Sequence, residues 1–305
     1  MARFLLSRLA ISCLVLIVVS MLSFGLFHLT GDAALAFAGE DTTEAEMALI
    51  RERLGLGKPI YLQYLVSVEK LLKGDFGISL FTQEPVIGLL ISKLAVTAKL
   101  AAISICIAVA IAIPLGVISA YTYNSWVDWL VTFSVTIGQA IPSFWLALML
   151  STFFGLYLGW LPVAGDGSLR HFVLPSVTLG IAMVPALTWV TKTGMLDVLD
   201  ASYILFARAK GLSSARIALF HALPNAILPV ISLLSVQLGQ LLAGSVVIET
   251  VFSINGIGRL ALVSIQRADL PIIQSVVLCL ACIYLVLTLL ADLVNRYIDP
   301  RLRNQ

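Results

Sequence analysis

Long apolar stretches dominate the pattern of hydrophobic and polar positions along the chain. Six of them reach roughly the 20 residues that an α-helix needs to cross the hydrocarbon core of a bilayer. The pattern therefore predicts an all-α integral membrane fold with six transmembrane helices. The predicted spans cover residues 9–30, 96–121, 129–158, 172–189, 226–248 and 272–293.

The first and fourth apolar segments need separate interpretation. The first could be a cleaved signal peptide, because Arg3 and Arg8 give it a positive start and Ala36-Phe-Ala38 resembles a cleavage site. Its apolar run is longer than the roughly 7–15 residues of a signal core, so we expect it to be retained as a helix. The fourth contains Pro175 and Pro185, which membrane helices tolerate when neighbouring groups satisfy the freed carbonyls.

Composition agrees with a membrane protein. Of the 305 residues, 60% are hydrophobic and 12% are charged, whereas soluble domains are about half apolar and about a quarter charged. The net charge of +2 is small, so we expect no nucleic-acid partner. Cys279 and Cys282 have the spacing of a redox motif, but no strand–helix–strand pattern surrounds them, and we expect them to pack as small apolar residues.

The distribution of lysine and arginine predicts the orientation in the membrane. With the N-terminus inside, the short cytoplasmic pieces carry nine of these residues, and the short outer loops carry only Arg170, Arg259 and Arg267. An excess of positive charge marks the cytoplasmic side of membrane proteins. We therefore expect both termini in the cytoplasm and residues 31–94 on the outer face.

The outer segment, residues 31–94, contains helical signals of its own. Thr43 and Glu46 form a capping box at the start of one predicted helix. Pro59 suits the first turn of a second helix that would run to Gly74. Because the segment is too short to bury an independent core, we expect a small helical extension of one transmembrane domain that comprises residues 1–305.

A second segment outside the membrane, residues 200–224, joins the fourth and fifth predicted spans on the cytoplasmic side. Ser202 can cap a short helix, and Gly211 suits the left-handed position that follows a helix. Ser213 can cap the next helix, and Pro224 begins the return to the membrane. Such a helix–glycine–helix projection fits a groove on a partner protein. An ordinary basic loop that contacts lipid head groups is the alternative.

Several kinds of chemical site are missing from the sequence. No stretch matches the Gly-x4-Gly-Lys-Ser/Thr phosphate loop, so the chain is not expected to be an ATPase. Its three histidines have no ligand spacing, and no cofactor or metal is expected. Lys99 and Glu249 lie towards span ends, where an interfacial position explains them. A transporter driven by a separate subunit and a stand-alone channel or sensor both remain open.

Polar residues inside the predicted spans are candidates for lining a pathway. Such side chains tend to face protein or a water-filled cavity, and hydrogen bonds between helices are the alternative role. Trp145 and Trp189 can either shape a passage or pack against neighbouring helices. The polar candidates are Gln139, Ser143, Thr188, Gln237 and Gln240.

The segment at residues 200–224 also carries a family resemblance. The stretch Ala207-Arg-Ala-Lys-Gly-Leu212 and the later Leu223-Pro-Asn225 resemble the cytoplasmic motif of ABC importer permeases, Glu-Ala-Ala-x3-Gly-x9-Ile-x-Leu-Pro. Leu205 and Phe206 stand in place of the Glu and the first Ala of that motif. The form found here is typical of the peptide and nickel permease branch.

Further stretches resemble the same branch in the same order along the chain. They are Leu54-Gly-Leu-Gly-Lys-Pro59, Gly74-Asp-Phe-Gly-Ile-Ser79, Pro142-Ser-Phe-Trp145, Glu249-Thr-Val-Phe252 and Asp299-Pro-Arg301. Together they identify the chain as a member of the dipeptide/oligopeptide/nickel permease family, as the first of its two permease subunits. Two positions depart from the family pattern: Trp189 stands where members often carry Arg, and Gly57 stands where Asp is frequent.

The resemblance implies a type I ABC importer fold in the bacterial inner membrane, surrounded by membrane lipid. It implies a second permease subunit, two ATP-binding subunits and an extracytoplasmic solute-binding protein as partners. Di- or oligopeptides are the leading substrate, and nickel or another small solute through the same architecture is the alternative. The residues that the motif assigns to coupling with the ATPase are Ala207, Arg208, Ala209, Lys210, Gly211, Leu223 and Pro224.

Overall fold

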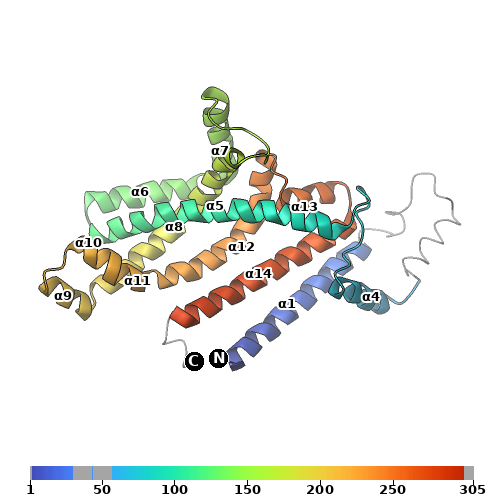
Figure 1. Ribbon diagram of the computed structural model, residues 1–305, viewed down its shortest axis with the longest axis horizontal. Helices are drawn as coiled ribbons and strands as arrows, with labels where there is room; N and C mark the ends of the chain where they lie inside the picture. Colours follow the sequence, from blue (N-terminus) through green and yellow to red (C-terminus); the bar gives the residue numbers. More distant parts are fainter. Residues whose placement is uncertain (1, 30–42, 44–56, 299–305) are drawn as a thin grey trace. The chain divides into compact units, whose positions relative to one another are not determined.

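Every regular element in the described part of the chain is a helix (Figure 1). The computed structural model describes residues 2–29, 43 and 57–298. The elements are α1 (Ala2–Leu29), α4 (Ile60–Leu72), α5 (Val86–Tyr121), α6 (Trp126–Ala140), α7 (Ser143–Leu150), η1 (Ser151–Tyr157), α8 (Leu169–Leu199), α9 (Ser202–Ala209), α10 (Ser214–Ile217), η2 (Ala218–Ala222), α11 (Leu223–Ala226), α12 (Leu228–Val251), α13 (Ile257–Gln266) and α14 (Leu270–Ile298).

The chain forms two compact units. The first comprises residues 1–95 and 256–285, and the second comprises residues 96–255 and 286–305. The long helices α5 and α14 each contribute residues to both units. Four helices are long and apolar enough to cross a membrane, and the number rises to six if each of two bent helix pairs is one span.

In the first unit, α1 contacts α4, and the beginnings of α5 and α14 pack with α13. The hydroxyl groups of Ser20 and Tyr64 lie 2.7 Å apart, and the ring of Tyr64 meets that of Phe24 edge to face. The packing of α5, α13 and α14 buries an apolar cluster around Val86 and Ile257. This cluster supports the loop between α4 and α5.

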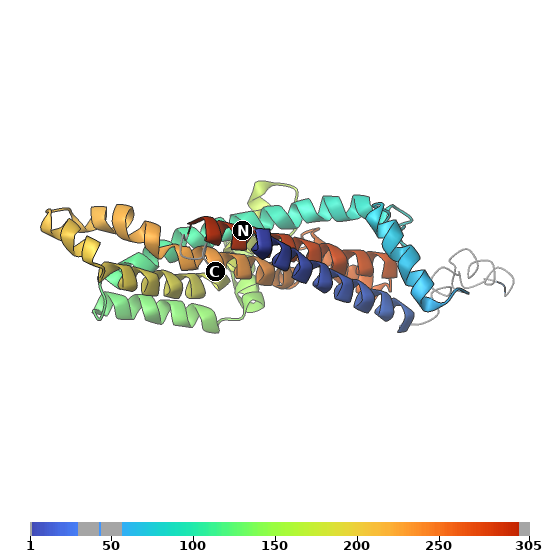
Figure 2. The same ribbon diagram turned by 90° about the horizontal axis from the view of Figure 1, so that it is seen from below.

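The second unit is built around α8, the most buried of the four long apolar helices. Glycine lets α5 approach it closely: a Cβ at Gly116 would lie 2.5 Å from Thr191 Cβ, and one at Gly180 would lie 2.9 Å from the Ser104 carbonyl oxygen. Small residues permit such close contact between membrane helices. Figures 1 and 2 show α6 beside α8, and apolar residues of α5, α6, α8 and α12 form one core cluster.

The segment 129–158, expected as one helical span, is divided in the structure. Helix α6 ends at Ala140, and the following helical run from Ser143 to Tyr157 is bent from it by 96°. Ile141 has an extended backbone, with φ −82° and ψ 121°. A residue before proline is driven away from the helical region by the proline ring. The break therefore follows from Pro142, which the continuous apolar pattern had concealed.

A second bend separates the run Ser214–Ala226 from the start of α12, at 55°. The predicted span 226–248 thus begins at Ala226, the last residue before this bend. Three prolines are accommodated within the long helices: Pro114 in α5, and Pro175 and Pro185 in α8. Helix α5 begins ten residues before the predicted span 96–121. Helix α8 continues to Leu199, beyond the end of the predicted span 172–189.

The predicted outer helix between Pro59 and Gly74 is present as α4, with Pro59 directly before its first residue. Gly74 has φ +79° and ends the element in the left-handed region. The helix predicted to begin at Thr43 lies, beyond Thr43 itself, outside the described residues.

Candidate functional site

The segment 200–224 contains the expected break between two helices. Helix α9 ends at Ala209, and Gly211 takes φ +78°, the left-handed conformation that its position predicted. The Gly211 N–H donates to the Arg208 carbonyl at 2.9 Å, and the Leu212 N–H donates to the Ala207 carbonyl at 3.3 Å. These bonds satisfy carbonyls at the end of α9 and fix the direction of the chain.

Other details of this segment differ from the prediction. Ser202 is the first helical residue, because Ala201 has the extended backbone of the N-cap, and no side chain caps the helix. Ser213 occupies the predicted N-cap of α10 without a capping hydrogen bond from its side chain. Pro224 lies in the first turn of α11, directly after the π-helical turn η2. Proline donates no N–H, and a widened turn before it avoids a clash with the preceding carbonyls.

One face of the segment is anchored in the second unit. Ile204 and Ala207 of α9 are buried, as are Ile217 and Ala222 of the following helical run. They form one cluster with residues of α8 such as Met195. The burial of alternate turns fixes both short helices to the end of α8, so the segment has a defined position within its unit.

The opposite face is apolar and exposed. Leu205 and Phe206 of α9 and Leu219 and Phe220 of η2 are each more than half exposed. The Lys210 ammonium lies 4.6 Å from the centre of the Phe206 ring. An exposed apolar patch bordered by cations is typical of a surface that contacts another protein.

Polar side chains without a recognisable motif in the sequence hold the segment at its base. The Asn225 amide donates to the Tyr203 hydroxyl at 3.0 Å and to the His221 carbonyl at 3.1 Å. The Tyr121 hydroxyl, at the end of α5, donates to the Ser214 carbonyl at 3.2 Å. These bonds connect α9, α10 and η2 to the helices on either side.

Among the residues assigned to coupling, two environments can be distinguished. Ala207 is buried and Leu223 is half-buried, so they serve as anchors. The remaining five are exposed: Arg208, Ala209, Lys210, Gly211 and Pro224. The exposed members can reach a partner, whereas the buried ones hold the segment to α8.

Close to this segment, an ion pair joins the beginning of α6 to α8. The Lys192 ammonium lies 2.5 Å from Asp128 Oδ1, and both side chains are almost buried. The Ser119 hydroxyl also donates to Asp128, and so does the Asn124 N–H at 3.1 Å. The ring of Trp189 lies 5.8 Å from the ammonium. Lys192 is one of the nine lysine and arginine residues predicted on the cytoplasmic side, and no local pattern in the sequence indicates Asp128 as its partner.

The predicted pathway residues are spread over several environments. Thr188 of α8 and Gln237 of α12 are buried, and α8 and α12 pack against each other. Gln139 of α6 and Gln240 of α12 are exposed on the surface of the chain, and Ser143 of α7 is half-buried. Because their burial differs so widely, no common role follows from it, and lining a pathway stays a prediction.

Glu249, near the end of α12, is fully buried against the protein. Its carboxylate accepts a hydrogen bond from the Thr97 hydroxyl at 2.7 Å. Lys99 is exposed, and its ammonium lies 4.5 Å from the centre of the Phe172 ring. Within the described residues, no group of three His, Cys, Asp or Glu side chains could hold a metal ion.

In the first unit, a buried carboxylate holds the loop between α4 and α5. Asp269, the residue before α14, accepts a hydrogen bond from the Ser79 hydroxyl at 2.6 Å. It also accepts from the N–H groups of Leu80 and Phe81, at 3.3 and 3.4 Å. Outside this contact, the Arg267 guanidinium stacks 3.7 Å from the centre of the Phe81 ring.

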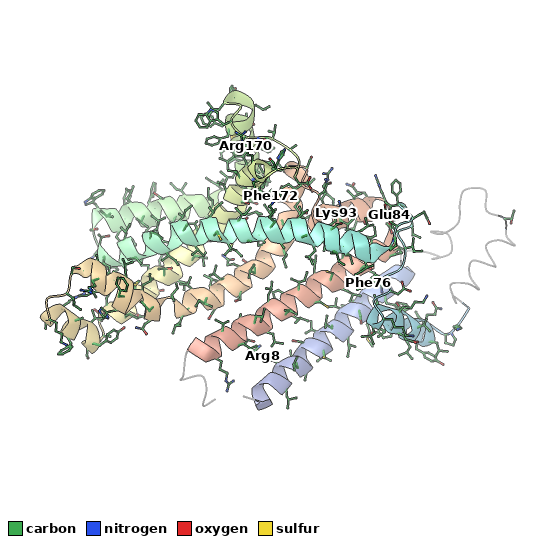
Figure 3. The ribbon with its side chains drawn as sticks, viewed as in Figure 1. Arg8, Phe76, Glu84, Lys93, Arg170 and Phe172 are labelled. Atoms are coloured by element: carbon green, nitrogen blue, oxygen red, sulfur yellow. The ribbon has the colours of Figure 1, made fainter. Side chains whose placement is uncertain are left out.

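The residues from Gly74 to Ser79, which contribute to the family resemblance, lie in this same loop, which continues to Val86. The Ser79 N–H donates to the Glu84 carbonyl, and the Val86 N–H donates to the Gly77 carbonyl, each at 3.0 Å. Figure 3 labels Phe76 and Glu84 in the segment that leads into α5. The loop is therefore closed on itself by hydrogen bonds between its two ends and secured by Asp269.

Helices long and apolar enough to span a membrane carry a projecting segment with an exposed apolar and cationic face, an arrangement typical of a membrane protein that contacts a partner. Two family models cover most of the chain. The model described as binding-protein-dependent transport system inner membrane component matches residues 112–304. Its N-terminal counterpart matches residues 1–101. The chain belongs to this family.

Relatives and solved structures agree with this assignment. The dipeptide transport system permease protein of Alkalihalophilus pseudofirmus is 34% identical over 99% of this chain and 100% of the relative. The glutathione transport system permease proteins of Salmonella typhimurium and Escherichia coli K12 are each 36% identical, over 99% and 94% of this chain and of the respective relative. The inward-facing methionine ABC transporter MetNI shares the fold, with TM-score 0.60 and 19% identity over 70% of this chain and 97% of that chain.

The family resemblance inferred from the sequence is thus confirmed. The chain is a permease subunit of a binding-protein-dependent ABC importer in the bacterial inner membrane, with an all-helical fold of the type I importer class. Permease components of this family are not themselves enzymes, and the alternative of a stand-alone channel or sensor is set aside. Nickel as a substrate receives no specific support from these relatives.

Proposed function

We propose that this permease forms, with a second permease subunit, the translocation pathway for di- and oligopeptides. The observation that carries the substrate class is the similarity over nearly the whole chain to a dipeptide permease and to glutathione permeases. Glutathione is itself a tripeptide, so both named substrates are short peptides. Two ATP-binding subunits would supply the energy, and an extracytoplasmic solute-binding protein would deliver the peptide.

The coupling segment, residues 200–224, is proposed as the contact with one ATP-binding subunit. Its support is the combination of an anchored inner face around Ile204 and an exposed outer face around Phe206. An apolar helical face of this kind seats in a groove of a partner. Closure of the ATP-binding subunits would then move α9 and, through the buried cluster, the end of α8. Different partner contacts in two states can exchange outward and inward openings.

For the passage itself, the proposed lining residues remain Gln139, Ser143, Thr188, Gln237 and Gln240. The exposed side chains of Gln139 and Gln240 would face the second permease or a water-filled pathway, since polar groups avoid lipid. Replacing each with cysteine and measuring labelling by a water-soluble thiol reagent tests this assignment. Cysteines at positions 139 and 240 should react with the reagent, and transported peptide should protect them. A position whose cysteine does not react does not line the passage.

Uptake in cells that lack this chain tests the substrate class. Restoring the chain should rescue uptake of a labelled dipeptide and leave uptake of labelled nickel unchanged. The rescue should require an ATP-binding subunit that can hydrolyse ATP. Rescue of nickel alone would retain the architecture and overturn the proposed substrate.

A pair of glycine variants tests the coupling segment. Gly211 and Gly74 have φ values of +78° and +79°, and a Cβ at either would meet no neighbouring atom within 4 Å. Valine is strained in this region of the backbone, so both substitutions carry the same local cost. Gly211→Val should lose co-purification with the ATP-binding subunits and peptide uptake, whereas Gly74→Val should retain the co-purification. Equal co-purification of the two variants would contradict the proposed contact.

A further inference from the structure

A cavity of about 360 Å³ lies at the beginning of α8 in the second unit. Trp160, Leu161 and Pro162 line one part of it, and Ser168, Arg170 and His171 line the other. Figure 3 labels Arg170 and Phe172 at this end of α8. We call it the α8 cavity. Neither the coupling segment nor the proposed pathway residues contribute to it.

The α8 cavity is open to the surface, and the loop beside it is held by backbone hydrogen bonds on both sides. The Trp160 N–H donates to the Phe154 carbonyl at 3.0 Å, and the Gly165 N–H donates to the Phe252 carbonyl at 2.8 Å. Gly165 takes φ +104°, and a Cβ there would lie 3.3 Å from the His171 ring. Because both ends of the loop are fixed, the side chains around the cavity have defined positions without a ligand.

Positive charge is concentrated on one side of the α8 cavity. Arg170 Nη2 donates to the Trp160 carbonyl at 2.9 Å, which fixes the guanidinium and leaves it further N–H donors. The positive end of the α8 helix dipole adds to the Arg170 charge. The first turn contains no acidic residue, and Asp166, two residues before the N-cap Ser168, accepts the Asn255 N–H at 3.3 Å. The Ser168 N–H donates to His171 Nδ1 at 3.2 Å, which caps the start of this helix, and the Ser168 hydroxyl oxygen lies 2.9 Å from the same nitrogen.

The other side of the cavity is apolar. The Trp160 side chain is more than half exposed and packs at 5.9 Å against the Phe154 ring, which holds its orientation. Leu161 and Pro162 extend this surface. A guanidinium held beside an exposed aromatic side chain suits a carboxylate attached to an apolar group. The volume is near the lower end of the roughly 300–1,000 Å³ of small-molecule sites, so it admits the end of a short peptide.

We propose that the α8 cavity binds the C-terminal residue of a peptide substrate, with the carboxylate on Arg170 and the last side chain against Trp160. This inference rests on the proposed peptide function. It assigns to the permease a recognition step of its own, separate from selection by the solute-binding protein. The preference should be for peptides with a free carboxyl group and an apolar last residue.

Equilibrium binding to the complete importer in lipid nanodiscs, without solute-binding protein, tests the proposal. The probes are labelled Ala-Phe and the same dipeptide with a C-terminal amide. The wild-type complex should bind the free acid about tenfold more tightly, the effect of one hydrogen bond to a charged group. Arg170→Gln should lower binding of the acid to that of the amide, and Arg170→Lys should retain part of the preference.

Arg267→Gln is the matched control, because it removes one cation from the other predicted outer loop. This control should keep the wild-type preference. Equal binding of acid and amide by the wild-type complex would overturn the proposal. A second assay adds the solute-binding protein to the same nanodiscs. The proposal would also be overturned if Arg170→Gln weakened retention of that protein and left the preference for the free acid unchanged. If restoring the wild-type chain to cells that lack it does not rescue dipeptide uptake, the proposed function itself is wrong, whatever the nanodisc result.

Discussion

Two turns of the chain, one in each unit, are each held by a single buried carboxylate. Asp128 accepts the N–H of Asn124 in the turn between α5 and α6. Asp269 accepts the N–H groups of Leu80 and Phe81 in the loop between α4 and α5. The two carboxylates therefore have the same local task, which is to satisfy backbone donors where a chain reverses or bends.

Their remaining partners differ in charge. Asp128 forms an ion pair with Lys192 of α8, and this pair joins two helices that are far apart in sequence. Asp269 accepts its other hydrogen bond from the neutral hydroxyl of Ser79. In the first case a cation balances the negative charge, whereas in the second the recorded donors are neutral dipoles.

This difference determines what each carboxylate leaves behind when it is removed. Neutralising Asp128 leaves a nearly buried ammonium without its counter-charge, and a buried unpaired charge is costly. Neutralising Asp269 leaves only neutral donors, which can turn to water at a smaller cost. The comparison predicts a larger loss of stability at Asp128.

The largest expected effect is therefore that of Asp128→Asn. We expect the free energy of unfolding to fall by about 3 kcal/mol, the lower part of the range for breaking a buried ion pair. Thermal unfolding of the importer in detergent, followed by tryptophan fluorescence, measures this as a lower Tm. Lys192→Met in the same chain should restore at least half of the loss, because it removes the orphaned charge. A double variant no more stable than Asp128→Asn would show that the ion pair is not the cause.

Asp269→Asn should have a smaller and more local effect. The amide places an N–H group opposite the donors of Ser79 and Leu80, and loss of such a bond costs about 1–2 kcal/mol. Hydrogen exchange of the Leu80 and Phe81 amides should become faster, with little change near α8. The control is Asp75→Asn, an exposed carboxylate of the same loop that accepts only the Gly77 N–H among its recorded bonds. If the Leu80 and Phe81 amides exchange at the same rate in Asp269→Asn as in Asp75→Asn, Asp269 does not hold the loop.

Features with a local signal in the sequence were predicted well. The left-handed conformation of Gly211 follows from its position between two short helices, and it is confirmed by its φ of +78°. The helix after Pro59 and the all-helical membrane fold follow from proline placement and from apolar runs. In each case the residues that decide the structure lie within a few positions of one another.

Features that depend on distant partners were missed. Asp128 and Lys192 are 64 residues apart, and Ser79 and Asp269 are 190 apart. No periodicity connects such positions, so neither carboxylate was singled out. The bend at Pro142 was missed for another reason: apolar residues continue on both sides, and their continuity suggested one helix although the proline favoured a break. The cavity beside Arg170 likewise depends on a loop that folds back onto α8.

The smallest expected effects come from the two serines, and their order should be the reverse of that of the carboxylates. The Ser119 hydroxyl donates to Asp128, which keeps Lys192 as its partner when the hydroxyl is lost. The Ser79 hydroxyl donates to Asp269 and also accepts the Thr82 N–H at 3.0 Å.

Ser79→Ala should therefore cost about 1 kcal/mol and Ser119→Ala about 0.5 kcal/mol, within the usual range for one hydrogen bond. Thermal unfolding of both variants under the same conditions measures the difference. If Ser119→Ala lowers the stability more than Ser79→Ala, Lys192 does not compensate Asp128 for the lost hydrogen bond. The proposed difference between a carboxylate paired with lysine and one held by neutral donors would then be wrong.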